Sequence, residues 1–174
     1  MTEQDILRRT SRSFHVTIRL LPEALRKDVG LAYLVARATD TIADTSSAAP
    51  EQRLDILKSV QASLGRRSIT GFEPAKWAGF QRDPAESELL RALPGLWARL
   101  GDRGEVTPLF TTLLDRILEG QIFDLERFPP GAPPLDDEEM EQYTWLVAGC
   151  VGEFWTDLCA LRLGNFATQP PEVM

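Results

Sequence analysis

The residues whose types and spacing suit chemistry lie on one predicted helix. Residues 31–45 contain neither Pro nor Gly. At a helical advance of about 100° per residue, Tyr33, Arg37, Asp40 and Asp44 fall within an arc of about 60°. The apolar residues of this segment occupy the opposite side, so one face can pack in a core while the other presents a phenol, a guanidinium and two carboxylates. This arrangement is typical of a functional site.

The two carboxylates suit a divalent cation. Asp40 and Asp44 are about one helical turn apart, which is close enough to hold a hard cation through oxygen ligands. Mg²⁺ fits best, because it takes one or two protein carboxylates and completes its shell with water and phosphate oxygens. The alternative is an ordinary solvated helix face on which Arg37 offsets the repulsion between the two acids. From spacing alone, that alternative is the commoner case.

Three motifs, in this order along the chain, favour a functional site over an ordinary solvated helix face. Residues 10–14 read TSRSF, residues 33–44 read YLVARATDTIAD, and residues 143–152 read YTWLVAGCVG. Together they resemble the squalene and phytoene synthase family. The resemblance covers nearly the whole chain and is loosest between about residues 65 and 86.

The resemblance implies a fold and a reaction. Members of this family are all-α proteins with an isoprenoid synthase-type helical bundle. They join two prenyl diphosphates head to head, with Mg²⁺ held by two aspartate-rich motifs on facing helices. Asp40 and Asp44 match the first motif, whereas the second, an Asn-x-x-Arg-Asp sequence, would lie downstream of Met174. We therefore expect residues 1–174 to form a single helical domain, the N-terminal portion of such a synthase truncated before its second motif.

The resemblance also implies roles for individual residues. Asp40 and Asp44 would hold Mg²⁺, and Arg37 would bind the diphosphate and take part in catalysis. Tyr33 and Tyr143 would be catalytic residues beside the carbocation. The residues implied to contact substrate are Ser11, Arg12, Phe14, Arg37 and Val147.

A further acidic residue lies between these motifs. Residues 120–125 read GQIFDL and resemble the Gly-Met-x-x-Asp-Leu helix of the same family, with Asp124 in its acidic position. A helix-end acid that pairs with Arg127 is an equally good interpretation.

The motif around Asp40 resembles squalene synthases more than phytoene synthases. It favours a Mg²⁺-dependent prenyltransferase that converts farnesyl diphosphate to presqualene diphosphate or squalene, with NADPH as reductant if squalene is the product. One alternative is a phytoene synthase acting on geranylgeranyl diphosphate. Another is a non-catalytic assembly or binding protein of the same fold, although the intact pair of Asp40 and Asp44 favours an enzyme.

Composition restricts the classes of partner and the cellular compartment that we expect for this protein. The net charge of −7 over 174 residues argues against a nucleic acid partner. Cys150 and Cys159 lie on one predicted helix, where they cannot bridge, and they indicate a reducing, cytoplasmic compartment. His15 is the single histidine, which excludes a histidine metal site. We expect neither a signal peptide nor a transmembrane segment, while an apolar product leaves room for peripheral membrane association.

Helical periodicity predicts the elements that position these residues. Helices are expected over residues 23–44, 51–64, 85–100 and 107–125, followed by a last helix from about residue 136 whose apolar stretch, residues 143–163, is expected to be buried. Residues 66–84 lack a sustained period and contain several Gly and Pro residues, which predicts a long connection. This connection is either a surface loop or a flap that brings basic residues to the diphosphate. The candidates for the flap are Arg66, Arg67 and Lys76.

Overall fold

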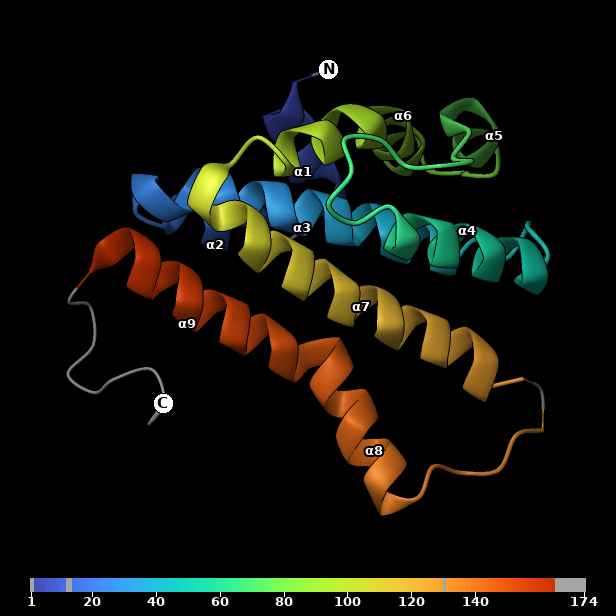
Figure 1. Cartoon of the computed structure of the whole chain (residues 1–174). Coiled ribbons are helices and arrows are strands. Elements are labelled where there is room, and N and C mark those ends of the chain that lie inside the picture. The colour runs from blue at the N-terminus through green and yellow to red at the C-terminus, as the bar shows by residue number, and fades with distance from the viewer. Residues whose placement is uncertain (1, 12–13, 130, 165–174) are drawn as a thin grey trace.

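Helix α3 (Glu23–Ala43) runs through the middle of the bundle in the computed structural model, which describes residues 2–11, 14–129 and 131–164 (Figure 1). In these ranges the regular structure is entirely helical, as the sequence predicts. The helices that contact α3 are α1 (Glu3–Thr10), α2 (Phe14–Leu20), α4 (Pro50–Ala62), α6 (Pro84–Leu100), α7 (Thr107–Arg127) and α9 (Cys150–Leu163).

One face of α3 forms the centre of the core. Leu31, Leu34, Val35, Ala38 and Ile42 have no exposed surface. Full burial of each of the larger side chains contributes about 1.5–3 kcal/mol, so this face fixes the orientation of the helix. The predicted helix over residues 23–44 is confirmed to within one residue.

The other helices form layers on either side of α3. Figure 1 shows α1, α5 (Pro74–Gly79) and α6 on one side, and α7 and α9 side by side on the other. Helix α4 packs against both α3 and α7. Three polar residues of α3, Tyr33, Arg37 and Asp40, border a space that α7 and the segment before α9 also line.

The expectation that residues 66–84 form one long connection is wrong, because these residues include helix α5. Pro74 opens this helix, and Trp77, which is 3% exposed, anchors it in the core. Six residues are too few to display a helical period, which is why the sequence pattern indicated only turns.

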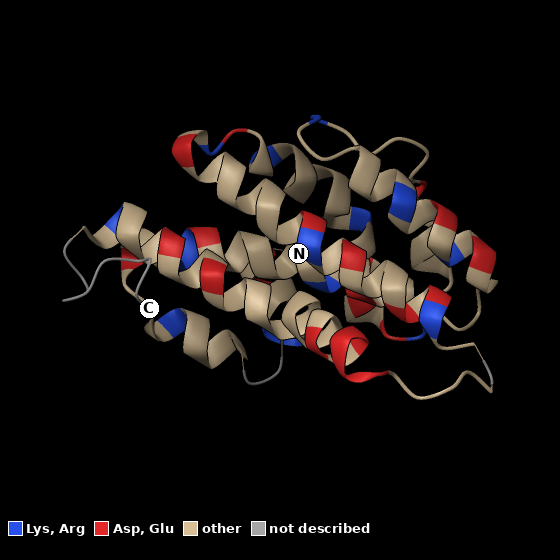
Figure 2. Ribbon diagram, turned by 60° about the horizontal axis from the view of Figure 1, so that its bottom comes forward, with Lys and Arg blue, Asp and Glu red and all other residues tan. Residues whose placement is uncertain are grey.

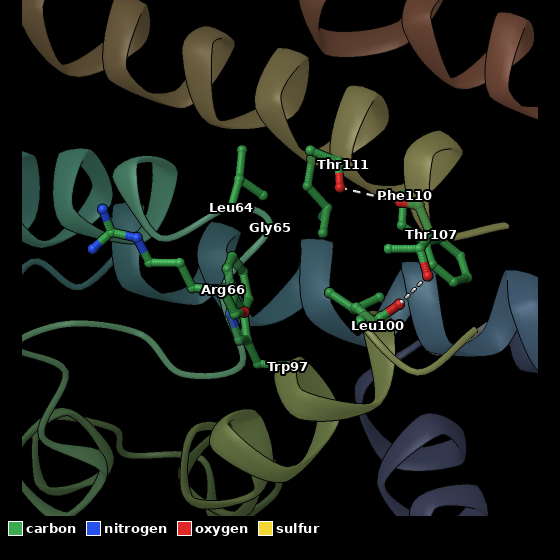
Figure 3. Close-up of a pocket in the computed structure, with 10 residues that line it drawn as sticks. Leu64, Gly65, Arg66, Trp97, Leu100, Thr107, Phe110 and Thr111 are labelled. Carbon is green, nitrogen blue, oxygen red and sulfur yellow. Dashed lines mark hydrogen bonds between the residues drawn. The ribbon is translucent and has the colours of Figure 1, made fainter. Parts of the chain in front are cut away.

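The residues before α5 form a surface loop. They border a small cavity of about 20 Å³ between α4, α6 and α7, where the Trp97 indole N–H donates a hydrogen bond to the Arg66 carbonyl (3.1 Å) (Figure 3). The Arg66 side chain points away from this cavity in Figure 3. Arg67 pairs with Asp102 at 2.7 Å, and Lys76 is exposed. The loop is therefore tied to the far end of α6.

The last predicted helix is interrupted. Helix α8 (Asp137–Thr144) is followed by a π-helical turn, η2 (Trp145–Gly149), and then by α9. Figure 1 shows α8 at a clear angle to α9. The expectation that this apolar stretch is buried is only half right. Phe154 and Leu158 are buried against α7, whereas Val151 is 45% and Trp155 is 39% exposed.

A buried ion cluster holds the beginning of α3 to two distant segments. The Asp28 carboxylate, 2% exposed, pairs with Arg103 Nη2 at 3.0 Å and with Arg162 Nη2 at 2.8 Å. Arg103 precedes the 3₁₀ turn η1 (Gly104–Val106), and Arg162 lies near the end of α9. Charge pairing thus joins the turn before α7 and the end of α9 to α3.

The exterior carries both charge signs. Figure 2 shows Lys and Arg positions interspersed with Asp and Glu positions along the helices. Within the ranges that the structure describes, no helix combines the length and apolar character needed to cross a membrane. Cys150 and Cys159 are free and buried.

Two glycines of the last segment provide a matched test of the π-helical turn. A Cβ atom at Gly149 would lie 2.8 Å from Trp145 Cδ1, whereas one at Gly152 would meet nothing within 4 Å. We expect Gly149→Ala to lower the free energy of unfolding by about 1–3 kcal/mol through overpacking. Gly152→Ala should raise it by about 0.5–1 kcal/mol, because Ala restricts the unfolded chain. Urea unfolding measures both; shifts of the same sign would contradict the close approach of Trp145.

Candidate active site

The polar stripe of α3 lines a cleft of about 290 Å³. Tyr33, Arg37 and Asp40 contribute to it, and all three are partly buried because the opposite face of α3 is packed in the core. The facing walls come from α7 and from the π-helical turn. Their lining residues are Ile117, Gln121, Leu146 and Val147.

Close helix packing forms the apolar wall. Gly120 of α7 lies against η2, where an added Cβ would be 3.2 Å from Leu146 Cβ. Without a side chain at this position, α7 and η2 approach closely enough for Ile117 and Val147 to border the same space. Val147 is 49% exposed, so it presents apolar surface to the cleft.

Arg37 is the cation of the cleft. Its Nη1 lies 2.5 Å from Asp40 Oδ2, and its Nη2 lies 2.8 Å from Glu86 Oε1 in the first turn of α6. Its Nε is buried and has no hydrogen-bond partner among the described residues. The guanidinium therefore keeps its buried Nε–H without a partner in a site where an unpaired donor is costly, which favours an anionic ligand there.

Asp44 lies at the C-terminal end of α3 and is exposed. Loss of hydration raises the pKa of this carboxyl, and the nearby carboxylates of Asp40, Asp124 and Glu86 raise it further against the opposing effect of Arg37. A carboxylate is also disfavoured by the helix dipole at this end. Asp44 is not among the residues that line the cleft, but the charges of two cleft residues, Asp40 and Arg37, act on its carboxyl.

Tyr143 is not among the residues that line the cleft, and it pairs with Asp124. Its hydroxyl donates a hydrogen bond to Asp124 Oδ1 at 2.9 Å, and its ring packs on Phe123 (5.6 Å between centroids) and Phe128 (5.8 Å). Burial raises the pKa of Tyr143, and the hydrogen bond that its hydroxyl donates to the negatively charged Asp124 carboxylate raises that pKa further. Arg127 pairs with Glu139 at 2.8 Å, so Asp124 is the partner of Tyr143 rather than of Arg127.

The described residues of the N-terminal motif, residues 10–14, lie in different surroundings. The Phe14 ring packs on Tyr33 with 5.6 Å between centroids, which places it next to the cleft. Ser11 is 3% exposed, and its hydroxyl donates to the Leu7 carbonyl within α1 and its C-cap. Arg12 lies outside the described residues.

Two polar residues of the site carry no clear signal in the sequence. Glu86 is one of many acids in first turns of helices, and its pairing with Arg37 joins positions 49 residues apart. Gln121 lines the cleft, and its buried Oε1 has no hydrogen-bond partner in the described part of the chain. Only the partial helical period of residues 107–125 could have placed Gln121 near Ile117.

The carboxylates fit a hard divalent cation in their chemistry. Asp40 contacts Arg37 through Oδ2, and neither its Oδ1 nor the Asp44 carboxylate accepts a hydrogen bond from the described residues. Oxygen donors in this state suit Mg²⁺, which takes few protein ligands. The described ranges contain no cluster of three or more His, Cys, Asp or Glu side chains arranged to hold a metal. A metal ion held by Asp40 and Asp44 would therefore complete its shell with water and phosphate oxygens.

Comparison with known proteins shows the same family from sequence and from structure. The Squalene/phytoene synthase family matches residues 7–169. A bifunctional lycopene cyclase/phytoene synthase of Blakeslea trispora is 32% identical over 157 residues, which cover 87% of this chain and 24% of that protein. A squalene synthase of Cyberlindnera jadinii is 28% identical over 168 residues, which cover 92% of this chain and 36% of that protein.

A solved structure has the same helical arrangement. The complex of TcSQS with the ligand E5700 matches with a TM-score of 0.70 and 26% identity, over 91% of this chain and 43% of that one. The chain thus spans less than half the length of each of these proteins, from 24% to 43%.

Charge repulsion at Asp44 predicts a stability effect with a definite pH dependence. Because the folded-state pKa of Asp44 is raised, the folded protein loses stability as the pH rises above the ordinary range of an Asp carboxyl. Asp44→Asn should therefore raise the melting temperature by about 1–2 °C at pH 7, after allowance for solvent screening, and leave it unchanged at pH 3.

Asp55→Asn, an exposed change on α4, is the matched control and should have little effect at either pH. Calorimetry at both pH values measures the difference. A lower melting temperature for Asp44→Asn at pH 7 would show that this carboxylate stabilises the fold.

Proposed function

Because the chain belongs to the squalene/phytoene synthase family, we propose that it takes part in the head-to-head condensation of two prenyl diphosphates. The observation that carries this proposal is the cleft, in which Arg37 and Asp40 face apolar walls formed by Ile117, Leu146 and Val147. A charged end and an apolar side match a substrate with a diphosphate and a hydrocarbon chain. Farnesyl diphosphate is the proposed substrate, with presqualene diphosphate or squalene as the product.

Arg37 binds the diphosphate in this proposal. Its buried Nε–H without a partner supports the role, since a phosphate oxygen would accept that hydrogen bond. A planar guanidinium presents its N–H groups in a fixed fork that matches the oxygens of a phosphate, whereas an ammonium is a point charge with rotatable donors. Arg12 and Ser11 remain proposed diphosphate contacts from the family resemblance alone.

Asp40 and Asp44 hold Mg²⁺ in this proposal, consistent with the general use of a divalent metal in the family. Bound Mg²⁺ would neutralise charge on the departing diphosphate. Asp40 keeps Oδ1 available for this purpose while its Oδ2 contacts Arg37. In this proposal, the two aspartates and Arg37 are the groups that promote ionisation of an allylic diphosphate bound in the cleft.

The apolar and aromatic groups protect the resulting carbocation. Tyr33, with Phe14 stacked on it, offers an aromatic face that stabilises positive charge. Val147 lines the pocket of the prenyl chain and helps to exclude water that would quench the cation. Tyr143, whose proton is directed to Asp124, is suited to hold a proton close to the reacting chain rather than to release it.

A phytoene synthase that acts on geranylgeranyl diphosphate is the second candidate. The similarity to the Blakeslea trispora protein, which covers 87% of this chain, favours it. NADPH belongs only to the squalene-forming reaction, so a requirement for it would separate the two. The intact pair of Asp40 and Asp44, with Arg37 beside it, favours an enzyme over the non-catalytic alternative, because metal-assisted departure of diphosphate needs these carboxylates.

Replacement of Asp40 tests the metal role. Asp40→Asn keeps the size of the side chain and removes the charge that attracts Mg²⁺. In a longer protein that also carries the second aspartate-rich motif, this change should lower product formation from farnesyl diphosphate by roughly two to four orders of magnitude. Mn²⁺ affinity in the presence of inorganic pyrophosphate, measured by calorimetry on the 174-residue chain, should fall at least tenfold.

Asp55→Asn is the control for a change of the same type at an exposed site outside the cleft. Thermal melting shows whether each variant is folded. If a folded Asp40→Asn protein binds Mn²⁺ as tightly as the wild type does, Asp40 is only a surface partner of Arg37 and not a metal ligand.

A further inference from the structure

We propose that Glu86 is a positioning residue that keeps the Arg37 guanidinium in the cleft when Asp40 turns to a metal ion. The proposal rests on the metal and diphosphate site described above and deepens it. It arises from one contact: Arg37 Nη2 lies 2.8 Å from Glu86 Oε1, while Arg37 Nη1 lies 2.5 Å from Asp40 Oδ2.

Asp40 cannot serve both partners equally. A divalent cation at its carboxylate withdraws negative charge from Arg37 and repels the guanidinium. A long arginine side chain released from its partner regains rotamer freedom and leaves its bound position. Glu86 prevents this, because it pairs with the other terminal nitrogen of the same guanidinium and comes from a different helix.

The backbone that carries Glu86 is held firmly. Asp83 caps α6 by accepting a hydrogen bond from the Ala85 N–H at 2.8 Å, and the Ser87 hydroxyl donates to the Ala78 carbonyl of α5 at 3.0 Å. Ala85 is buried beside it. The Glu86 carboxylate therefore starts from a fixed point, which lowers the entropy cost of holding Arg37.

Glu86 acts through Arg37 rather than on a ligand. It is absent from the lining of the cleft, whereas Arg37 lines it and carries the unpaired Nε. The side chains of Arg37 and Glu86 are 29% and 27% exposed, so the pair is only partly screened by solvent. Their contact differs in this respect from exposed surface pairs such as that of Arg67 and Asp102.

The two possible effects of Glu86 on anion binding have opposite signs. As a nearby negative charge alone, Glu86 would repel pyrophosphate, and its removal would tighten binding. As the holder of Arg37, it would promote binding, and its removal would weaken it. Glu86→Gln should therefore weaken the binding of pyrophosphate with Mn²⁺ to the 174-residue chain by about three- to tenfold in calorimetry.

The control is Glu88→Gln, the same change two residues along α6, which should leave this affinity within twofold of the wild type. In an Arg37→Gln background, Glu86→Gln should have no further effect, because its target is gone. Unchanged or tighter binding by folded Glu86→Gln, or an equal loss in the Arg37→Gln background, would overturn the positioning role.

A second measurement separates this inference from the proposed function. Asp40→Asn imitates an Asp40 whose charge is taken up by a metal, and urea unfolding of single and double variants in that background measures the coupling of Arg37 and Glu86. We expect the coupling to persist, and its disappearance would refute the positioning role. If the wild-type chain binds no Mn²⁺ with pyrophosphate, the proposed metal and diphosphate site fails, and the coupling alone decides the role of Glu86.

Discussion

The burial of one face of α3 is the constraint on which the rest of the structure depends. This face lies in the core against several helices, so its orientation is set by apolar packing. The opposite face, with Tyr33, Arg37 and Asp40, is thereby directed toward α7 and η2. Any change that rotated α3 to relieve crowding among its polar groups would expose Leu34 and Val35. The core therefore holds the polar groups where repulsion alone would separate them.

Several carboxylates share one arginine in this structure. Asp40 and Glu86 contact Arg37 directly, and the charges of Asp40, Asp124 and Glu86 all act on the carboxyl of Asp44. A fold selected only for stability would avoid such an excess of negative charge beside a half-buried helix. In the proposed function, a metal ion at the carboxylates and a diphosphate at Arg37 would offset this electrostatic cost.

The sequence predicted the helices of this protein better than the ion pairs that join them. The apolar period of residues 31–45 gave the orientation of α3, because burial and helical spacing both act within one element. The pairing of Arg37 with Glu86 and the cluster of Asp28 with Arg103 and Arg162 could not be read in this way. They join residues far apart in the chain, and a charged residue on a helix has no pattern that names its partner.

The π-helical turn at Trp145–Gly149 lets the last helical segment hold one residue more than regular α-helical winding would place there. Without this wider turn, the extra residue would rotate everything on one side of it by about 100°. Tyr143 would then leave Asp124, or Phe154 would leave the core. The turn thus absorbs a residue inside a helical segment, as a loop does between helices, and keeps the contacts on both sides of it in place.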